Sequence, residues 1–472
     1  MLRSCDRSDS NDREFSCDPV VIGGNKGDMG KQTSLNRRGF LKGSTGAGLL
    51  ICSSQVAFGY KANEKLNVAC IGVGGQGVSN TRGVSGENVV AVCDVDEKRA
   101  AQMLKQYSGT KRYKDFRLML SEMDKEIDAV VVCTPDHTHA VAAVGAMKQG
   151  KHVYCEKPLT RTVHEARMMR LTAAKHKVVT QMGNQGSASE GVRRATEWGA
   201  AGTVGPVENA YLWVSDGSAT MTRPKDTPTV PNNLDWDLWL GPASERPYHP
   251  SYLPFIWRGW RHFGSGSLGD MGCHTGNFLF RCLNLGELWE PGGSSNAKRI
   301  RIEGEATGVH AEGYPASTRV HFHIPARGDM PAVKLTVSSG QKMRPSADLL
   351  HGKQPGSFGS LLIGTKGSIY SSNPWNTSSE ILSKDKGSIK EPPKTLPRGV
   401  SHHREWIDAC KGKGETFSSF AIGGPLTELI QLTNIAGIVG EPFHYDTLTG
   451  EIPDHGGASA LLHRPYRKGW AL

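Results

Sequence analysis

The chain has 472 residues, enough for two or three domains, and 37% of them are hydrophobic, which is enough for a sizeable core. Its formal net charge of +10 is spread along the sequence, without a basic tract that carries interleaved aromatic residues, so nucleic-acid binding is not indicated. No apolar run reaches the length of a membrane-spanning helix, and we expect no stable span in the mature protein.

Residues 1–62 lack the pattern of a folded domain. The stretch NRRGFLKGSTGAGLLICSSQVAFG, residues 36–59, has two adjacent arginines, then an apolar glycine-rich run, then small residues. This order is typical of a twin-arginine export signal, and the alternative is a disordered basic arm. We predict the signal at 29–62, preceded at 1–28 by a misassigned start or a disordered segment. The protein is then periplasmic or otherwise exported, and it folds with its cofactor before export.

Residues 63–183 alternate short apolar runs with helix-like stretches. The runs are LNVACIG, NVVAVCDVD, AVVVCTP, HVYCEKP and VVTQMG, and the helix-like stretches are 97–107, 139–148 and 162–175. This alternation is typical of parallel strands covered by helices on both faces. We therefore predict an α/β Rossmann-type dinucleotide-binding domain, whose ligands lie at the carboxyl ends of the strands.

The turn after the first run reads IGVGGQG and fits the pattern G-x-G-x-x-G. It follows a predicted strand and opens a helix, where glycines permit a tight turn and let backbone N–H groups approach a pyrophosphate. The residues that we expect at the cofactor here are Gly72, Gly74, Gly75, Gln76 and Gly77.

Asp94 ends the second run, about twenty residues further on. A carboxylate at this position accepts the hydroxyl groups of the adenosine ribose and repels a 2′-phosphate, so NAD is favoured over NADP. The alternative interpretation is an ordinary turn acid. Lys98 and Arg99 lie close by in the sequence and could hold a 2′-phosphate, which keeps NADP as the second choice of cofactor.

Two later stretches are more specific. TPDHTHAVAAVGAMKQGKHVYCEKPLT, residues 134–160, resembles the signature of the Gfo/Idh/MocA family, named after glucose–fructose oxidoreductase and inositol dehydrogenase. FGSGSLGDMGCHTGN, residues 263–277, resembles the family's second signature, a glycine-rich run into D-x-G-x-H. The resemblance covers essentially everything from Leu66 onward.

The resemblance implies a second domain, at 184–472, which binds substrate and carries a large, open, mostly antiparallel sheet of an α+β fold. One face of such a sheet usually makes a homodimer or homotetramer contact. The runs that fit its strands are PVENAYLWV, RIRIEGEATGV, TRVHFHIP, VKLTVSS and SLLIGTKGSIYSS, and the helical pieces are 190–200, 402–411 and 425–439.

The resemblance also implies the catalytic set Lys157, Asp270 and His274. A histidine titrates near neutral pH and suits the role of base for a hydroxyl proton, while a lysine cation stabilises a developing alkoxide. Asp270 would orient or tune these neighbours. The further cofactor contacts that we expect at the ends of the strands are Thr134, Pro135, His139, Glu156, Lys157 itself and Asn184.

A metal site is the competing interpretation of Asp270 and His274, which stand one helical turn apart. His137 and His139 could add ligands, but no further ligand has the spacing of an established motif, so we expect no metal. The glycines around this pair are expected to let the backbone pass close to substrate and cofactor.

Aromatic and polar residues flank the second signature. In FIWRGWRHFG, the rings of Trp257 and Trp260 could stack on a sugar while Arg258 donates to its hydroxyl groups, although a packed loop with a buried Trp260 explains the pattern equally well. Further substrate contacts are expected from residues near the strand ends and the signature. They are Asn277, Gln185 and His137, the last of which could instead face solvent.

The sequence thus favours an NAD-dependent dehydrogenase that oxidises a hydroxyl group of a sugar, glycoside or cyclitol. The first alternative is a redox-neutral enzyme with tightly held NAD, which exchanges hydride between sugars or cleaves or epimerises a glycoside through transient oxidation. The second is a sugar or NAD sensor without catalysis, against which the intact catalytic set argues.

Overall fold

The structure is a computed structural model, and it describes residues 64–214, 221–293, 298–340, 343–383 and 389–472. The predicted export signal at 29–62 and the segment 1–28 lie outside these ranges. The described residues belong to one compact unit, which contains two β-sheets with helices packed on them.

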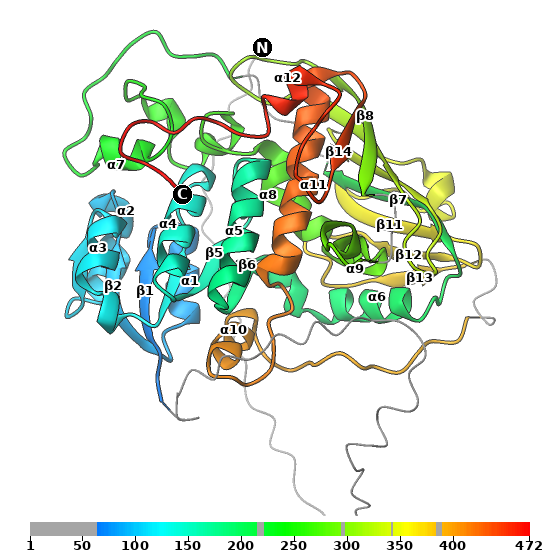
Figure 1. The fold of residues 1–472 in the computed structure, drawn as a ribbon, viewed down its shortest axis with the longest axis horizontal. Helices are drawn as coiled ribbons and strands as arrows, with labels where there is room; N and C mark the ends of the chain where they lie inside the picture. Colours follow the sequence, from blue (N-terminus) through cyan, green and yellow to red (C-terminus); the bar gives the residue numbers. More distant parts are fainter. Residues whose placement is uncertain (1–63, 215–220, 294–297, 341–342, 384–388) are drawn as a thin grey trace, which may run out of the picture. The chain divides into compact units, whose positions relative to one another are not determined.

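The first sheet has six parallel strands in the order β3-β2-β1-β4-β5-β6 (Figure 1). This is the strand order of a Rossmann domain, and it confirms the predicted fold class for the first half. The strands are β1 (Asn67–Ile71), β2 (Asn88–Cys93), β3 (Lys111–Tyr113), β4 (Ala129–Val132), β5 (His152–Glu156) and β6 (Thr180–Gly183). The helices between them are α1 (Gln76–Gly83), α2 (Glu97–Gln106), α3 (Phe116–Glu122), α4 (Asp136–Lys148) and α5 (Val163–His176).

Both faces of this sheet are buried, because successive side chains of each strand point to opposite sides. On β1, Ala69 and Ile71 join an apolar cluster with α3, α4 and α5, whereas Val68 and Cys70 join a second cluster with α2. The second cluster also contains the fully buried Trp406 of α10 (His402–Cys410), which comes from far along the chain.

The second sheet has eight strands in the order β13-β12-β11-β7-β10-β9-β8-β14. Every pairing in it is antiparallel except that of β7 with β10, which confirms the predicted mostly antiparallel sheet. The strands are β7 (Val207–Val214), β8 (Arg299–Thr307), β9 (Ser317–Ile324), β10 (Val333–Ser339), β11 (Phe358–Gly364), β12 (Ser368–Ser371), β13 (Glu380–Leu382) and β14 (Phe443–Asp446). The remaining α-helices are α6 (Glu190–Ala200), α7 (Trp236–Leu240), α8 (Gly266–Thr275), α9 (Asn277–Cys282), α11 (Phe420–Val439) and α12 (Gly456–Ser459).

Helix α11 joins the two halves. In Figure 1 it is the orange helix that runs beside α5, and it also packs on α8 and on strands β8 and β9 of the second sheet. Almost all of its side chains are buried, as expected of a helix that is enclosed on every side. It begins at Phe420, ahead of the start at Pro425 that the sequence indicated.

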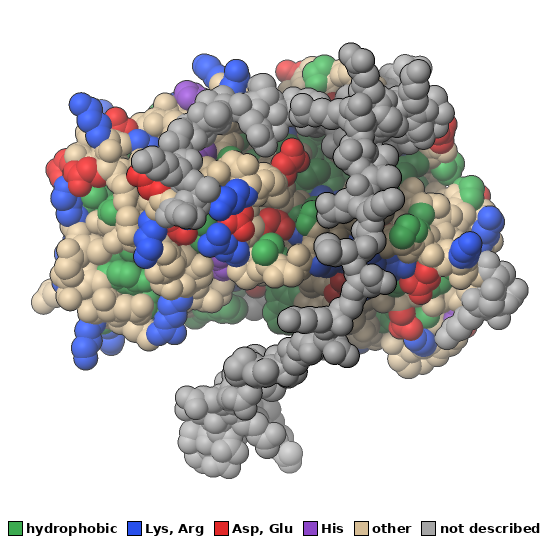
Figure 2. Space-filling view, turned by 90° about the horizontal axis from the view of Figure 1, so that it is seen from below, with side chains coloured by type: hydrophobic (Ala, Val, Ile, Leu, Met, Phe, Trp, Pro, Cys, Tyr) green, Lys and Arg blue, Asp and Glu red, His purple; other side chains and the backbone are tan. Residues whose placement is uncertain are grey.

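The face of the second sheet away from these helices is polar in its centre, where side chains of Asn209, Arg319, His321 and Lys334 line a shallow hollow. The oligomer contact expected on such a face stays a prediction. On the face of the molecule seen in Figure 2, basic and acidic side chains are interspersed. Among the described helices, none is both long enough and apolar enough to cross a membrane.

Candidate active site

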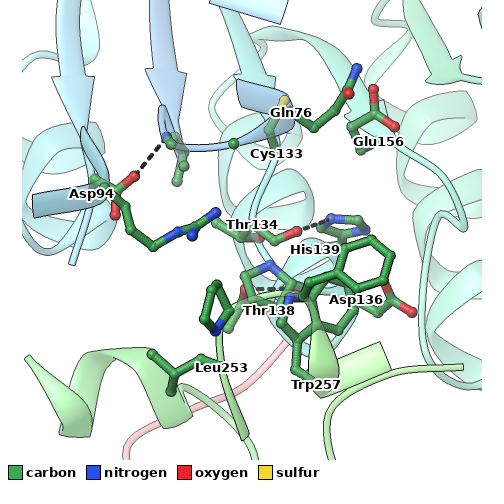
Figure 3. Close-up of a pocket in the computed structure, with 18 of the residues that line it drawn as sticks. Gln76, Asp94, Cys133, Thr134, Asp136, Thr138, His139, Glu156, Leu253 and Trp257 are labelled. Atoms are coloured by element: carbon green, nitrogen blue, oxygen red, sulfur yellow. Dashed lines mark hydrogen bonds between the residues drawn. The ribbon is translucent and has the colours of Figure 1, made fainter. Parts of the chain in front are cut away.

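A cavity of about 550 Å³ lies at the carboxyl ends of β1, β2, β4 and β5. Its first wall consists of the turns that follow these strands. Its second wall comes from the segment 253–258, from α8 and from Trp375, which all belong to the second half of the chain. Figure 3 shows Leu253 and Trp257 across the cavity from Asp94 and Thr134.

The turn after β1 requires glycine at two positions. Gly72 has a φ of +77°, and a Cβ there would lie 2.8 Å from the carbonyl carbon of Cys133. A Cβ at Gly77 would lie only 1.8 Å from the carbonyl oxygen of Gly72. Gly74, Gly75 and Gln76 line the cavity where α1 begins, which is the end of a helix that attracts an anion. The backbone here fits the pyrophosphate of a dinucleotide.

Asp94 directly follows β2 and ties this strand to the glycine turn. Its Oδ2 accepts hydrogen bonds from the backbone N–H groups of Val73 (2.9 Å) and Gly74 (3.1 Å). Its Oδ1 accepts one from Asp96 (3.0 Å). Burial raises the pKa of Asp94 while these bonds oppose the rise. Because a carboxylate oxygen has room for further donors, Asp94 both shapes the turn and fits the ribose hydroxyls.

Two cations line the same end of the cavity. A Cβ built on Gly75 would lie 2.8 Å from Nη2 of Arg99, so this guanidinium covers the glycine turn. Lys114 also lines the cavity and pairs with Glu97 across 2.9 Å. The sequence named Arg99 as a potential partner for a 2′-phosphate, and its guanidinium does lie beside the glycine turn.

Lys157, Asp270 and Arg258 meet in the cavity. Nζ of Lys157 donates to Oδ1 of Asp270 at 2.7 Å, and Nε of Arg258 donates to the same oxygen at 2.9 Å. Burial disfavours ionisation of Asp270, but these two cations outweigh it and lower its pKa to about 2. Asp270 is therefore a carboxylate at neutral pH. Within the described ranges, no three histidine, cysteine or acidic side chains gather as metal ligands.

His274 stands one turn after Asp270 on α8 and lines the same cavity. Its side chain is 3% exposed, and its Nδ1 has no hydrogen-bond partner within the described part of the chain. Burial, reinforced by the charge of Lys157, lowers the pKa of His274 well below its usual value. The imidazole is therefore neutral at pH 7 and has an unused nitrogen.

The glycines of α8 serve the packing of this helix. A Cβ at Gly272 would lie 2.7 Å from Cδ1 of Ile430 on α11. A Cβ at Gly276 would lie 2.8 Å from Cδ1 of Leu212 on β7. The expectation that these glycines bring the backbone close to substrate is thus replaced by a different role, because they let α8 approach its neighbours and so fix Asp270 and His274.

Asp136 is a cavity residue that the sequence analysis missed. It is the first residue of α4, is 3% exposed, and lines the cavity beside Lys157, Arg258 and Asp270. Burial raises the pKa of Asp136 to about 7, with Arg258 and a hydrogen bond to Ser265 acting in the opposite direction. Its place directly after Thr-Pro, where β4 ends at the ligand edge of the sheet, is a signal that could have identified it.

The turns after β4 and β5 are joined through His139. Its Nε2 lies 2.7 Å from the carbonyl oxygen of Thr134, a contact drawn in Figure 3, and its Nδ1 lies 2.9 Å from that of Pro158. His139, Thr134 and Pro135 all line the cavity. The imidazole thereby holds the Lys157–Pro158 turn against the start of α4.

Glu156 is the centre of a polar network beneath the same site. Its Oε1 accepts hydrogen bonds from Nδ2 of Asn80 and from Nε2 of Gln185, both at 2.8 Å. Asn80 in turn contacts Nε2 of His403 on α10 at 2.9 Å. Glu156 and Gln185 both line the cavity, but Gln185 is held by protein partners, which include the hydroxyl of Tyr154.

Five residues that the sequence assigned to ligands lie outside the cavity lining, and one of them, Gly77, acts through the steric fit of the turn described above. His137 is buried between the rings of Trp239 and Phe263, and its Nε2 lies 2.8 Å from the carbonyl oxygen of Trp239. Trp260 is 1% exposed and donates to the carbonyl oxygen of Ser251 at 3.0 Å. The structure therefore replaces both expected contacts with packing roles, which for Trp260 is the alternative given above.

The other two are Asn184 and Asn277. Asn184 is fully buried, donates to the carbonyl oxygen of Cys273 at 3.3 Å and accepts a hydrogen bond from Oγ of Ser418 at 2.6 Å. Asn277 is 1% exposed and accepts from Nε of Arg281 at 3.1 Å. Both amide groups are used within the protein: Asn184 links two distant segments, and Asn277 binds a side chain of its own helix, α9.

The second wall also contains aromatic side chains that the sequence analysis did not single out. Phe255 and Trp375 line the cavity although they are 67% and 49% exposed, so they stand at its mouth. Trp257, which was named above as a candidate sugar contact, also lines the cavity, and in the sequence it lies between these two residues. Phe255 stands inside the FIWRGW stretch, whereas Trp375 lies in a distant turn-rich segment that carries no motif.

Residues 66–184 match the model of the Gfo/Idh/MocA oxidoreductase family for its NAD-binding Rossmann fold. Residues 207–280 match the model for that family's C-terminal alpha/beta domain. The two matches fall on the two sheets described above and include both signatures.

Individual relatives match over shorter lengths. "Inositol 2-dehydrogenase 2" of Saccharopolyspora erythraea is 40% identical over 101 residues, which are 21% of this chain and 29% of that protein. "Levoglucosan dehydrogenase" of Pseudarthrobacter phenanthrenivorans is 27% identical over 188 residues, 39% of this chain and 40% of that protein. The chain thus matches well under half the length of these curated relatives.

Solved structures match over most of the chain. An inositol dehydrogenase homolog from Azotobacter vinelandii, complexed with NADH and myo-inositol, aligns with a TM-score of 0.53 and 16% identity. The alignment covers 82% of this chain and 99% of the other. At this identity the likeness demonstrates the shared two-domain fold.

Proposed function

Because the chain belongs to the Gfo/Idh/MocA oxidoreductase family, with its NAD-binding Rossmann fold, we propose that it is an NAD-dependent dehydrogenase of hydroxyl groups. It takes hydride from a carbinol carbon of a sugar, glycoside or cyclitol. The relatives named for inositol and levoglucosan support this class of substrate.

The observation that carries the proposal is the neutral, buried His274 beside the Lys157–Asp270 pair, in the same cavity as the glycine turn. NAD, when bound, supplies the acceptor for a hydride from the substrate carbon. The chain must then supply a base for the hydroxyl proton and positive charge for the oxygen that loses it.

His274 meets the first need, because it lines the cavity and its imidazole is uncharged at neutral pH. Lys157 meets the second need, because Asp270 holds its ammonium group in place and its side chain lines the cavity. Asp270 acts by positioning the two cations. The O–H proton passes to His274, the C–H bond gives up its electron pair as hydride, and a carbonyl group remains.

A second candidate rests on Asp136. Net oxidation of a hydroxyl group needs one base, yet Asp136 places a second proton-exchanging group in the cavity, with a pKa of about 7. A redox-neutral enzyme would use such a group to remove or return a proton at a carbon next to a transient carbonyl group. Permanently held NAD would also suit the predicted export signal, because the cofactor would travel with the folded protein.

The test uses the purified full-length protein with added NAD and a panel of glucose, myo-inositol, levoglucosan and methyl glycosides. A dehydrogenase produces NADH absorbance together with an oxidised sugar, and a redox-neutral enzyme forms product without net NADH. Mass spectrometry of the gently denatured protein identifies any NAD or NADP that it retains. If no member of the panel is altered and no dinucleotide binds, the proposal is wrong.

A further inference from the structure

Large aromatic side chains stand exposed at the mouth of the catalytic cavity. Phe255 is 67% exposed and Trp375 is 49% exposed, while both line the cavity. Single exposed apolar side chains are common on protein surfaces and need no explanation. Two rings that border one ligand-sized cavity are a different case, because they extend its apolar surface outward to where a bound ligand would protrude.

Both rings lie close to the pair on α8, Phe255 through the side chain of Arg258 and Trp375 directly. The guanidinium carbon of Arg258 stacks 4.4 Å from the ring of Phe255 and 4.3 Å from that of Trp257, and Arg258 binds Asp270 at 2.9 Å. The ring of Trp375 lies 6.4 Å from that of His274, in an edge-on arrangement. The aromatic side chains therefore flank the reacting position from two sides.

The backbone holds both rings in place. Trp375 is in the loop between β12 and β13, where its N–H donates to Oδ1 of Asn373 at 3.1 Å. Its carbonyl oxygen packs so closely on Gly186 that a Cβ there would lie 2.0 Å away. The indole is thus half exposed on an anchored loop, which makes it a rigid platform.

Phe255 has a φ of +62° and a ψ of −45°, a backbone conformation that residues other than glycine seldom adopt. Such strain persists only where the surroundings hold it, and it is concentrated at functional positions. Here it directs a large apolar side chain outward rather than into the nearby cluster of Leu253, Tyr252 and Trp260.

We propose that Phe255 and Trp375 form a subsite for a second ring, so that the preferred substrates are glycosides with a ring aglycone, either another sugar or an aryl group. Sugar and aryl rings both present flat faces that stack on aromatic side chains. The reacting sugar lies beside Lys157 and His274, and the aglycone lies between cavity and solvent. This inference rests on the dehydrogenase function proposed above.

The experiment compares kcat/KM for a free sugar, its methyl glycoside, its 4-nitrophenyl glycoside and a disaccharide, with glucose and galactose as the reacting sugars. We expect the ratio of 4-nitrophenyl glycoside to free sugar to fall about tenfold in Phe255→Ala and in Trp375→Ala, mainly through KM. Trp375→Phe, which keeps a ring, restores most of the ratio. Leu118→Ala on α3 removes a side chain that is 56% exposed but outside the cavity, and it leaves the ratio unchanged.

The inference is overturned if the ratio for both alanine variants stays within about twofold of the parent protein. It is also overturned if the variants change sedimentation but not the ratio, since the rings then cover a second copy of the chain. If the parent protein oxidises none of these compounds, the proposed function fails separately. Calorimetric binding of 4-nitrophenyl glycoside in the presence of NAD, compared between parent and Trp375→Ala, then decides the subsite by itself.

Discussion

At the scale of single residues, Asp270 and His274 have opposite electrostatic roles although they lie one turn apart on α8. Asp270 is held as an anion by Lys157 and Arg258, and its pKa is lowered to about 2. His274 is kept neutral by burial and by the positive charge of Lys157. One helix turn thus supplies both the group that fixes the cations and the group that accepts a proton.

His274→Ala removes the proposed base and leaves the glycine turn intact. We expect kcat to fall by about 10²- to 10⁴-fold, the usual contribution of a positioned general base, while the affinity for NADH changes little. Steady-state kinetics and NADH fluorescence titration measure the two quantities. His444→Ala is the matched control, because this histidine is partly exposed and pairs with Asp454, away from the cavity. If His274→Ala turns over substrate as fast as the parent protein, His274 is not the base.

Asp136 gives a prediction about pH. Its pKa is raised from 3.8 to about 7, mainly by burial, so the folded protein keeps a proton on this carboxyl group that the unfolded chain releases. The resulting stabilisation is complete below pH 3.8 and is lost as the pH rises through about 7. Lys157, Arg258 and Asp270 are the charged groups that face it; the two cations oppose the rise and Asp270 adds to it.

Asp136→Asn keeps the shape of the neutral side chain and cannot ionise. We expect the variant to gain stability over the parent protein as the pH rises from 5 to 8, by on the order of a few kcal/mol, because each pKa unit corresponds to about 1.4 kcal/mol. Urea unfolding at several pH values measures the difference. A constant difference across this range would mean that Asp136 does not titrate there. If Asp136 also exchanges a proton during turnover, the variant loses the limb of the pH–rate profile near 7.

At the scale of elements, the turn from β1 to α1 depends on glycine for steric reasons. Gly77→Ala would place a methyl group 1.8 Å from the carbonyl oxygen of Gly72, so the turn must open. We expect NADH affinity to fall at least about tenfold, because the helix start no longer approaches the pyrophosphate. Gly86→Ala, where nothing lies within 4 Å, is the control with the same chemical change in the turn before β2. Equal NADH affinities in the two variants would contradict the proposal that this turn holds the pyrophosphate.

The regular elements were largely predictable from the sequence. The runs LNVACIG and AVVVCTP contain β1 and β4, and the helix expected at 190–200 has those bounds as α6. Local signals suffice there because buried parallel strands are short, apolar and bounded by turns. β3 was not predicted, because Lys111–Tyr113 is short, polar and mostly exposed.

The cavity was only partly predictable, because its lining depends on contacts between distant segments. Motif residues such as Gly72 and Lys157 stand at strand ends, whose position in a doubly wound sheet is known in advance. His137 and Asn184 also follow strands, but neighbours brought from elsewhere, such as Trp239 and Ser418, bind them inside the protein. Asp136 owes its raised pKa mainly to burial in a cavity that is closed by segments of the second domain, and Arg258 and Asp270, which modify it, come from those segments, so no local pattern contains them.

At the scale of the whole molecule, a buried ionic cluster connects the two halves. Glu428 of α11 is fully buried, and its Oε2 accepts hydrogen bonds from Nε1 of Trp289 at 2.7 Å and from the hydroxyl of Tyr445 on β14. Arg167, on α5 of the first domain, pairs with the same oxygen across 3.3 Å. Burial raises the pKa of Glu428 while the charge of Arg167 opposes the rise. The first domain therefore supplies the countercharge for a carboxylate in the interior of the second.

Arg167→Met leaves this carboxylate buried without its cation. Removal of one partner from a buried pair is expected to cost about 3–5 kcal/mol, whereas a second change, Glu428→Gln, should return part of that loss. Lys353→Met is the control, because its pair with Glu380 is about half exposed on both sides and should contribute less than about 1 kcal/mol.

Urea unfolding followed by tryptophan fluorescence and by NADH release tests the coupling. We expect both signals to shift together in Arg167→Met, since each domain then loses stability through the other; a shift in only one signal would mean that the domains unfold independently.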